Sequence, residues 1–320
     1  MMHITTDKFK SWGVKARSFP EYKYKVLWHN LKTIQIGEEK SNNLPIEYSE
    51  FLDVAINNKC NALCDFCYVS ATNKGENYEH ICETWKKWMN NYRECNINGI
   101  TLTEKVLQIA IGSTGEPTIH PEFCNFLKTV YETGVVPNYT TNGIILSAYN
   151  DSTNPNYELA NKILEVTNKY CGSVAVSYGN ISIRNQANLA IIGLMEKGNV
   201  KINIHHLISD KKSVDEFIKW QLFWGNEVSC HTLLPLMPDG RSNKGIEKGV
   251  FQYLEDMILK NHIKNVSFGA HFIKDLKHSK IKTWLFDEYS ISANCILRPN
   301  NIILTKSSFD LKPVKVINLC

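Results

Sequence analysis

The chain has 320 residues, of which 43% are hydrophobic and 21% are charged, and its formal net charge is +4. This composition is typical of a soluble globular protein, and so small a positive charge does not by itself indicate a nucleic-acid partner. No apolar run approaches the roughly 20 residues of a membrane-spanning helix, and the polar N-terminus lacks the apolar core of a secretory signal. We therefore expect a cytoplasmic protein whose ten cysteines are thiols or metal ligands and not a disulfide framework.

The first predicted element is a hairpin at residues 22–36, which are rich in aromatic and β-branched side chains. From residue 51 onward, short β-branched runs alternate with amphipathic stretches of helical length. Strands are predicted at 51–57, 106–111, 135–140, 173–178, 200–207, 228–234 and 265–272. Helices are predicted at about 77–95, 121–133, 156–170, 185–197, 213–224, 246–261 and 273–286.

This alternation predicts an α/β fold, a partial (β/α)6 TIM-like barrel with an N-terminal β-hairpin and a small C-terminal extension. We expect three regions: an N-terminal extension at 1–50, a core at 51–240 and a C-terminal extension at 241–320 that could bind substrate. In such barrels the reactive groups gather at the C-terminal ends of the strands. Functional motifs should therefore follow the predicted strands directly.

The strongest chemical signal is a loop with three cysteines, Cys60, Cys64 and Cys67, directly after the first core strand. Three thiolates within eight residues can bind one soft metal centre. Structural zinc sites usually close with four protein ligands, and no fourth Cys or His lies within ten residues after Cys67. The three ligands would leave a metal position open to an exogenous ligand. Three unrelated buried thiols, or half of a zinc site, are the alternatives.

The spacing C-x3-C-x2-C, with Phe66 just before the third cysteine, resembles the radical S-adenosylmethionine (SAM) superfamily. The resemblance implies that Cys60, Cys64 and Cys67 bind three irons of a [4Fe–4S] cluster, whose fourth iron is chelated by SAM. It also implies reductive cleavage of SAM to a 5′-deoxyadenosyl radical that abstracts hydrogen from a substrate. The expected electron donor is a flavodoxin or a ferredoxin. Phe66 and Tyr68 are expected to contact the cofactor.

Two later motifs extend the resemblance. The segment 112–117, GSTGEP, is similar to the GGEP motif of that family, which implies that Thr114, Gly115 and Glu116 orient SAM, with the Glu116 carboxylate near its ammonium. An ordinary βα turn is the alternative. A TNG sequence after the third core strand places Thr141 and Asn142 as further cofactor contacts.

The next two core strands carry further candidates for SAM binding. Ser177 ends the fourth strand and Arg184 follows it, and by resemblance both reach the ribose or carboxylate of SAM. A solvated helix-start charge is the alternative for Arg184. In the fifth strand, His205 and His206 are adjacent, so strand alternation points one inward and one outward. His206 is the candidate for contact with the cofactor, and a satisfied core histidine is the alternative.

A motif that begins the C-terminal third of the chain gives an indication of the substrate class. The segment 235–241, PLMPDGR, resembles radical SAM enzymes with a SPASM or twitch extension, many of which modify peptides or proteins. The extension is degenerate, because Ser307 stands where a second cysteine is usual and Cys295 and Cys320 remain. We therefore expect a peptide or protein substrate and doubt an auxiliary cluster. A nucleotide or RNA substrate, or a non-enzymatic zinc or iron–sulfur module, are the alternatives.

Overall fold

The computed structural model describes residues 7–19, 24–37, 51–197, 199–263, 265–269, 272, 275, 279–281 and 301–303. The expectations for Cys295, Ser307 and Cys320 lie outside these residues, as does most of the helix predicted at 273–286. Among the described helices, none is long and apolar enough to cross a membrane.

The larger of two sheets forms the predicted α/β core. Within the described ranges it has eight strands in the order β12-β11-β10-β9-β8-β7-β4-β13, and every neighbouring pair is parallel. No pairing within those ranges joins β12 to β13, so the sheet is an open, partial barrel, as predicted. The strands are β4 (Phe51–Ala55), β7 (Gln108–Ile111), β8 (Val136–Thr141), β9 (Ser173–Ser177), β10 (Lys201–Ile208), β11 (Cys230–Pro235), β12 (Val266–Phe268) and β13 (Asn301–Ile303).

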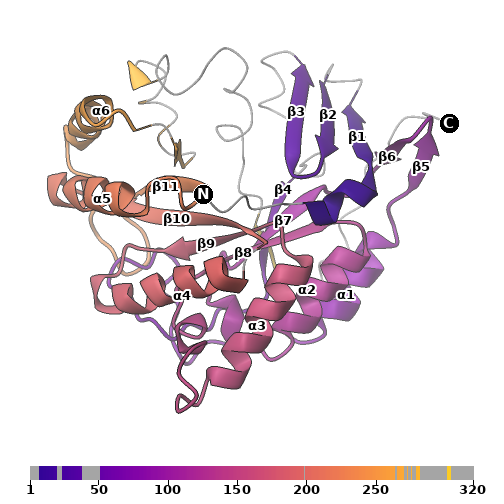
Figure 1. Ribbon diagram of the computed structural model, residues 1–320, viewed down its shortest axis with the longest axis horizontal. Coiled ribbons are helices and arrows are strands. Elements are labelled where there is room, and N and C mark those ends of the chain that lie inside the picture. Colours follow the sequence, from indigo (N-terminus) through magenta and orange to yellow (C-terminus); the bar gives the residue numbers. More distant parts are fainter. Residues whose placement is uncertain are drawn as a thin grey trace.

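A helix follows each of six successive strands of this sheet in the described chain, which gives the six predicted βα units. Figure 1 shows α1 to α4 side by side along one face of the sheet. The helices are α1 (Ile81–Met89), α2 (Phe123–Glu132), α3 (Tyr157–Tyr170), α4 (Arg184–Lys197), α5 (Lys211–Trp224) and α6 (Val250–Lys260).

The predicted helix at 77–95 is the main correction to the predicted elements. The observed helix starts only at Ile81, because His80 before it has a left-handed φ of 58°. It ends at Met89, and the chain then forms a hairpin of β5 (Glu94–Ile97) and β6 (Ile100–Thr103).

The smaller sheet has the order β3-β2-β1-β6-β5 among the described residues. The predicted hairpin is present as β2 (Tyr24–His29) and β3 (Lys32–Gly37), which pair antiparallel. The sequence did not reveal β1 (Val14–Phe19), which pairs parallel with β6 and so joins the N-terminal region to the α1–β7 connection.

The smaller sheet packs against the N-terminal ends of the barrel strands. Phe9, in the 3-10 helix η1 (Asp7–Trp12), and Trp28 are buried in one cluster with Leu107 and Val136, which stand at the starts of β7 and β8. Among the described residues, the smaller sheet therefore lies at the end of the strands opposite to the motifs.

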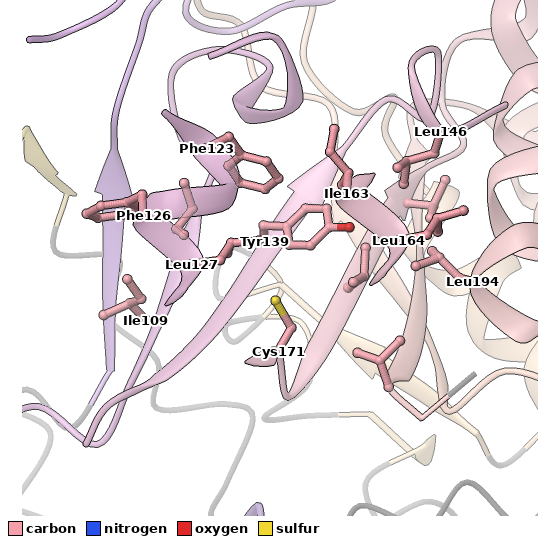
Figure 2. Packing of buried hydrophobic residues seen from close by; sticks show 14 of the residues in the cluster. Ile109, Phe123, Phe126, Leu127, Tyr139, Leu146, Ile163, Leu164, Cys171 and Leu194 are labelled. Carbon is pink, nitrogen blue, oxygen red and sulfur yellow. The ribbon is translucent and has the colours of Figure 1, made fainter. Parts of the chain in front are cut away.

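The main core lies between the larger sheet and its helices. Figure 2 shows Phe123 of α2 beside Tyr139 of β8, together with Ile163 of α3, and Phe126 of α2 on the side away from Tyr139. Phe123 and Tyr139 meet edge to face with ring centroids 5.1 Å apart, and the Tyr139 hydroxyl lies 2.9 Å from Thr167 Oγ1. Thr167 therefore gives the buried Tyr139 hydroxyl, the only polar atom of the two rings, a hydrogen-bond partner.

The opposite, inner face of the sheet differs in chemistry. Strand residues such as Ile109, Val174 and Ile204 belong to the helix-side core, so their neighbours in sequence point inward. A closed TIM barrel fills its interior with bulky branched side chains, whereas most residues of the inner face here are small or polar, with Leu207 and Leu234 near the rim as exceptions. Its residues include Asp53, Ala110, Asn138, Thr140, Ala175, Ser177, Asn203, His205, Cys230, Thr232 and Ser267.

Candidate functional site

The three cysteines lie on one loop that leaves the C-terminal end of β4. All three are free and half-buried. The base of the loop is fixed, since the Cys60 N–H donates to the Thr72 carbonyl at 2.9 Å. Inside the loop, the Cys67 N–H donates to the Cys64 carbonyl at 3.2 Å. The loop therefore places three thiols at the rim of the open barrel, as the sequence predicts.

Two of the sulfurs accept hydrogen bonds from asparagine side chains of other loops. Asn180, after β9, donates from Nδ2 to Cys64 Sγ at 3.2 Å, and Asn142, after β8, donates to Cys60 Sγ at 3.9 Å. Burial raises the pKa of both thiols, and the Asn180 hydrogen bond opposes this shift at Cys64. Amide donors stabilise the thiolate form, which is the form that ligates metals.

The three cysteines are a donor set of the kind that binds an iron–sulfur cluster. Among the described residues, no three His, Cys, Asp or Glu side chains are grouped as ligands of one metal ion. In a [4Fe–4S] cluster each cysteine binds a different iron, so the sulfurs need not converge on one point. Three half-buried thiols on one loop, two of them with amide donors, fit such a cluster.

The GSTGEP segment packs directly on the start of the cysteine loop. Thr114 Oγ1 donates to the Asn57 carbonyl at 2.6 Å, and the Glu116 N–H donates to the Lys59 carbonyl at 2.8 Å. A Cβ at Gly115 would stand 2.6 Å from the Lys59 carbonyl oxygen, so only glycine permits this approach. The close packing fixes the segment beside the cysteines.

The Glu116 carboxylate connects two loops by hydrogen bonds, a role that the sequence did not reveal. Its buried carboxylate accepts hydrogen bonds from Thr118 N–H and Oγ1, from Thr141 Oγ1 at 2.7 Å and from Asn142 N–H at 2.7 Å. These bonds tie the loops after β7 and β8 together. The ammonium contact of Glu116 stays a prediction, whereas Thr141 is buried against Glu116 and does not face the cleft as expected.

The two adjacent histidines of β10 point to opposite faces of the sheet. Ile204 and Ile208 lie in the helix-side cores, so His206 between them also faces the helices. It is buried, with Nε2 3.0 Å from His231 Nδ1 and its ring centroid 5.2 Å from that of Phe217 in α5. The structure therefore corrects the expectation for His206.

His205 is the histidine that faces the barrel interior. It pairs in register with Ser177 of β9 on one side and with Thr232 of β11 on the other. Ser177 thus ends its strand on the inner face at the rim, as predicted. Burial lowers the pKa of His205 to about 4, so its ring is neutral near neutral pH.

Arg184 departs from its expected role. Its Nη1 donates to Glu216 Oε2 at 2.6 Å, and its guanidinium lies over the rings of Tyr178 and Trp220. This ion pair joins the start of α4 to α5. The arrangement gives Arg184 an internal partner and does not support the predicted contact with SAM.

Phe66 and Tyr68 lie on the two sides of Cys67. The Phe66 ring packs over Gly179, where an added Cβ would stand 3.2 Å from Cζ. Tyr68 donates from its hydroxyl to the Ser113 carbonyl at 2.5 Å, which connects the cysteine loop to the end of β7. Both residues therefore connect the cysteine loop to the strand ends, and their contact with a cofactor stays a prediction.

Comparison with known proteins gives a likeness in structure alone. No family model and no curated protein matches the chain. Streptococcus suis SuiB bound to S-adenosylmethionine aligns with a TM-score of 0.51, 15% identity and 83% coverage of this chain. SuiB bound to the precursor peptide SuiA aligns with a TM-score of 0.53, 16% identity and the same coverage. The chain spans 60% of the length of each SuiB structure. The chain therefore shares the fold of SuiB over most of its length.

Proposed function

We propose that this protein is a radical SAM enzyme that holds a [4Fe–4S] cluster on Cys60, Cys64 and Cys67 and modifies a peptide or protein. The observation that carries the proposal is the placement of three free thiols on one loop at the barrel rim, with amide donors on two of the sulfurs. When bound, the cluster and SAM would supply a one-electron cleavage to methionine and a 5′-deoxyadenosyl radical that abstracts hydrogen.

The chain's own residues position this chemistry. Thr114 and Gly115 hold the backbone beside the cysteine loop, where it can meet the amino acid part of SAM. Ser177 presents a hydroxyl at the end of β9, and Phe66 offers a ring face in the same region. The substrate would approach from the rim toward the polar residues of the inner face, such as Asn203 and Thr232.

A peptide substrate is favoured over a nucleotide by two observations. SuiB, which shares the fold, has been crystallised with its precursor peptide SuiA. The net charge of +4 is small for a chain of this length and gives little electrostatic attraction for a phosphate backbone. We further propose a cytoplasmic location with a flavodoxin or ferredoxin as electron donor, because free thiols and an iron–sulfur cluster require a reducing compartment.

The test is an anaerobic assay of the full chain. The protein is reconstituted with iron and sulfide and reduced with dithionite, and 5′-deoxyadenosine from SAM is measured together with metal content. We expect 5′-deoxyadenosine and about four irons per chain. About eight irons would indicate an additional cluster. Stoichiometric zinc without SAM cleavage would contradict the proposal and favour a structural metal site.

A further inference from the structure

The barrel interior carries one carboxylate below the cysteine loop. Asp53 stands in β4 between Leu52 and Val54, which are both buried in the helix-side core, so its side chain lies on the inner face. In register, Asp53 pairs with Ala110 of β7, which pairs with Asn138 of β8. On its other side Asp53 pairs in register with Asn301 of β13, so the two residues beside it in the sheet, Ala110 and Asn301, carry no charge.

No positive charge compensates Asp53 within the described part of the chain. No hydrogen bond or ion pair to its carboxylate is found there, and desolvation alone raises its pKa to about 6. Asp53 is therefore largely ionised near neutral pH, in a site from which water is partly excluded. Burying a charge without a partner costs free energy that an opposite charge would offset.

The other titratable groups of the inner face do not supply that opposite charge. His205 is neutral near neutral pH, because burial lowers its pKa to about 4. The Cys230 thiol is neutral too, since burial raises its pKa. Lys201, at the start of β10, has its pKa lowered by burial and by the nearby Lys32, and it exerts no resolved effect on Asp53.

The position of Asp53 suits a long side chain that enters from the rim. Asp53 lies two residues inside the end of β4, which corresponds to about 7 Å of strand. Tyr68, on the cysteine loop, is close enough for the Asp53 charge to contribute to its raised pKa, behind burial as the main cause. Asp53 therefore lies beneath the loop, within reach of an extended lysine or arginine side chain held at the rim.

We infer that Asp53 binds a cationic group of the substrate, the ammonium or guanidinium of a lysine or arginine side chain in a peptide. That the substrate is a peptide is taken from the proposed function, and the inference rests on it in this respect. The carboxylate would anchor the tip of the side chain in the barrel, and its stem carbons would lie near the rim beside the cysteine loop. A bidentate arginine–carboxylate pair is the strongest form of this contact.

The experiment measures equilibrium binding in the absence of reductant, so it does not depend on SAM cleavage. Two fluorescein-labelled heptapeptides, Gly-Ser-Gly-X-Gly-Ser-Gly, carry arginine or its neutral isostere citrulline at X. Their binding to the reconstituted full chain with SAM is followed by fluorescence anisotropy. We expect the arginine peptide to bind about ten-fold more tightly, as one partly buried charge pair can supply.

Two variants locate the effect. Asp53→Asn keeps the shape and removes the charge, and it should bring the two affinities to within about two-fold of each other. Asp151→Asn changes an exposed carboxylate in the loop before α3 and should keep the ten-fold ratio. If Asp53→Asn melts well below the wild type, Asp53→Glu is the second variant, and it should keep a preference for arginine.

Three outcomes would overturn the inference: equal affinity of the wild type for both peptides, no binding of the arginine peptide up to about 10 mM, or an undiminished preference in Asp53→Asn. The assay of 5′-deoxyadenosine on the same wild-type sample separates the two proposals. SAM cleavage without a charge preference removes only the role of Asp53. A charge preference without SAM cleavage keeps the cationic site and removes the proposed function.

Discussion

Arg241 Nε donates a 2.7 Å hydrogen bond to the carbonyl oxygen of Cys64, which joins two residues 177 positions apart in the chain. The same guanidinium donates from Nη1 to the Ala71 carbonyl at 2.8 Å, and the Arg241 N–H donates to the Cys67 carbonyl at 3.0 Å. Gly240 makes this approach possible, because a Cβ there would stand 2.3 Å from the Cys67 oxygen. The loop after β11 thus fixes the shape of the cysteine loop.

Replacing Arg241 should therefore weaken the cluster site without touching a sulfur. We expect Arg241→Ala to lose most of its reconstituted iron, or to lose it at least about five-fold faster to a chelator, because the guanidinium no longer holds the Cys64 and Ala71 carbonyls. Arg241→Lys should behave similarly, since an ammonium cannot reproduce the planar fork. Iron per chain and the rate of chelation are measured, with Lys244→Ala, an exposed change in the same loop, as the control. Wild-type behaviour of Arg241→Ala would contradict this account.

The three cysteines themselves give the sharpest prediction. Cys60→Ala, Cys64→Ala and Cys67→Ala should each reduce 5′-deoxyadenosine formation below detection, because three protein ligands leave no redundancy. Cys95→Ala, in β5 of the smaller sheet, should retain wild-type iron content and SAM cleavage. Any of the first three variants that cleaved SAM at the wild-type rate would rule out the assigned ligand set.

Asn180 should tune the reduction potential of the cluster. Loss of an N–H···S hydrogen bond removes a donor that stabilises the more negative, reduced state, so Asn180→Ala should shift the potential downward by tens of millivolts. The potential is read by electron paramagnetic resonance during a redox titration. Ser182→Ala is the control, since it removes a hydroxyl that donates to Asn180 Oδ1 and leaves the amide nitrogen in place. An unchanged potential in Asn180→Ala would show that this hydrogen bond does not persist with the cluster bound.

Buried histidines should make the fold sensitive to acid. Burial lowers the pKa of His205 and of His231 to about 4, whereas an unfolded histidine titrates near 6.5. Between these values the unfolded chain binds protons that the folded chain does not, so the free energy of unfolding falls as pH falls from 6.5 to 4. Asp53 opposes this trend, because its raised pKa makes the folded chain bind a proton more readily between about pH 6 and 3.8.

Burial lowers the pKa of four histidines, including His205 and His231, and raises the pKa of two carboxyl groups, Asp53 and Glu116, so a net loss of stability is expected on acidification. His205→Gln should reduce the slope of the free energy of unfolding by up to about 1.4 kcal/mol per pH unit in this window. Urea unfolding of the wild type and the variant at several pH values between 4.5 and 7 measures the slopes. Identical slopes would mean that His205 titrates normally in the folded chain.

The sequence by itself determined the parts that depend on neighbouring residues. Runs of β-branched residues and amphipathic stretches predicted the strands and helices of the partial barrel, because each element's period is a local property. The three cysteines lie within eight residues, so their spacing alone indicated a shared metal centre. The motifs that end in Glu116 and Ser177 followed strands, and this order predicted that they meet at the rim.

Only the tertiary structure decided which side chains the site uses. The adjacent His205 and His206 are equivalent in sequence, and the burial of Ile204 and Ile208 against the helices assigned His205 to the interior. Arg184 forms an ion pair with Glu216 of α5, and Arg241 donates a hydrogen bond to Cys64, 177 residues earlier in the chain. Such partners depend on how distant loops pack, because hydrogen bonds and ion pairs form wherever folding brings donor and acceptor together. The local periodicity of the sequence does not predict which distant loops pack together.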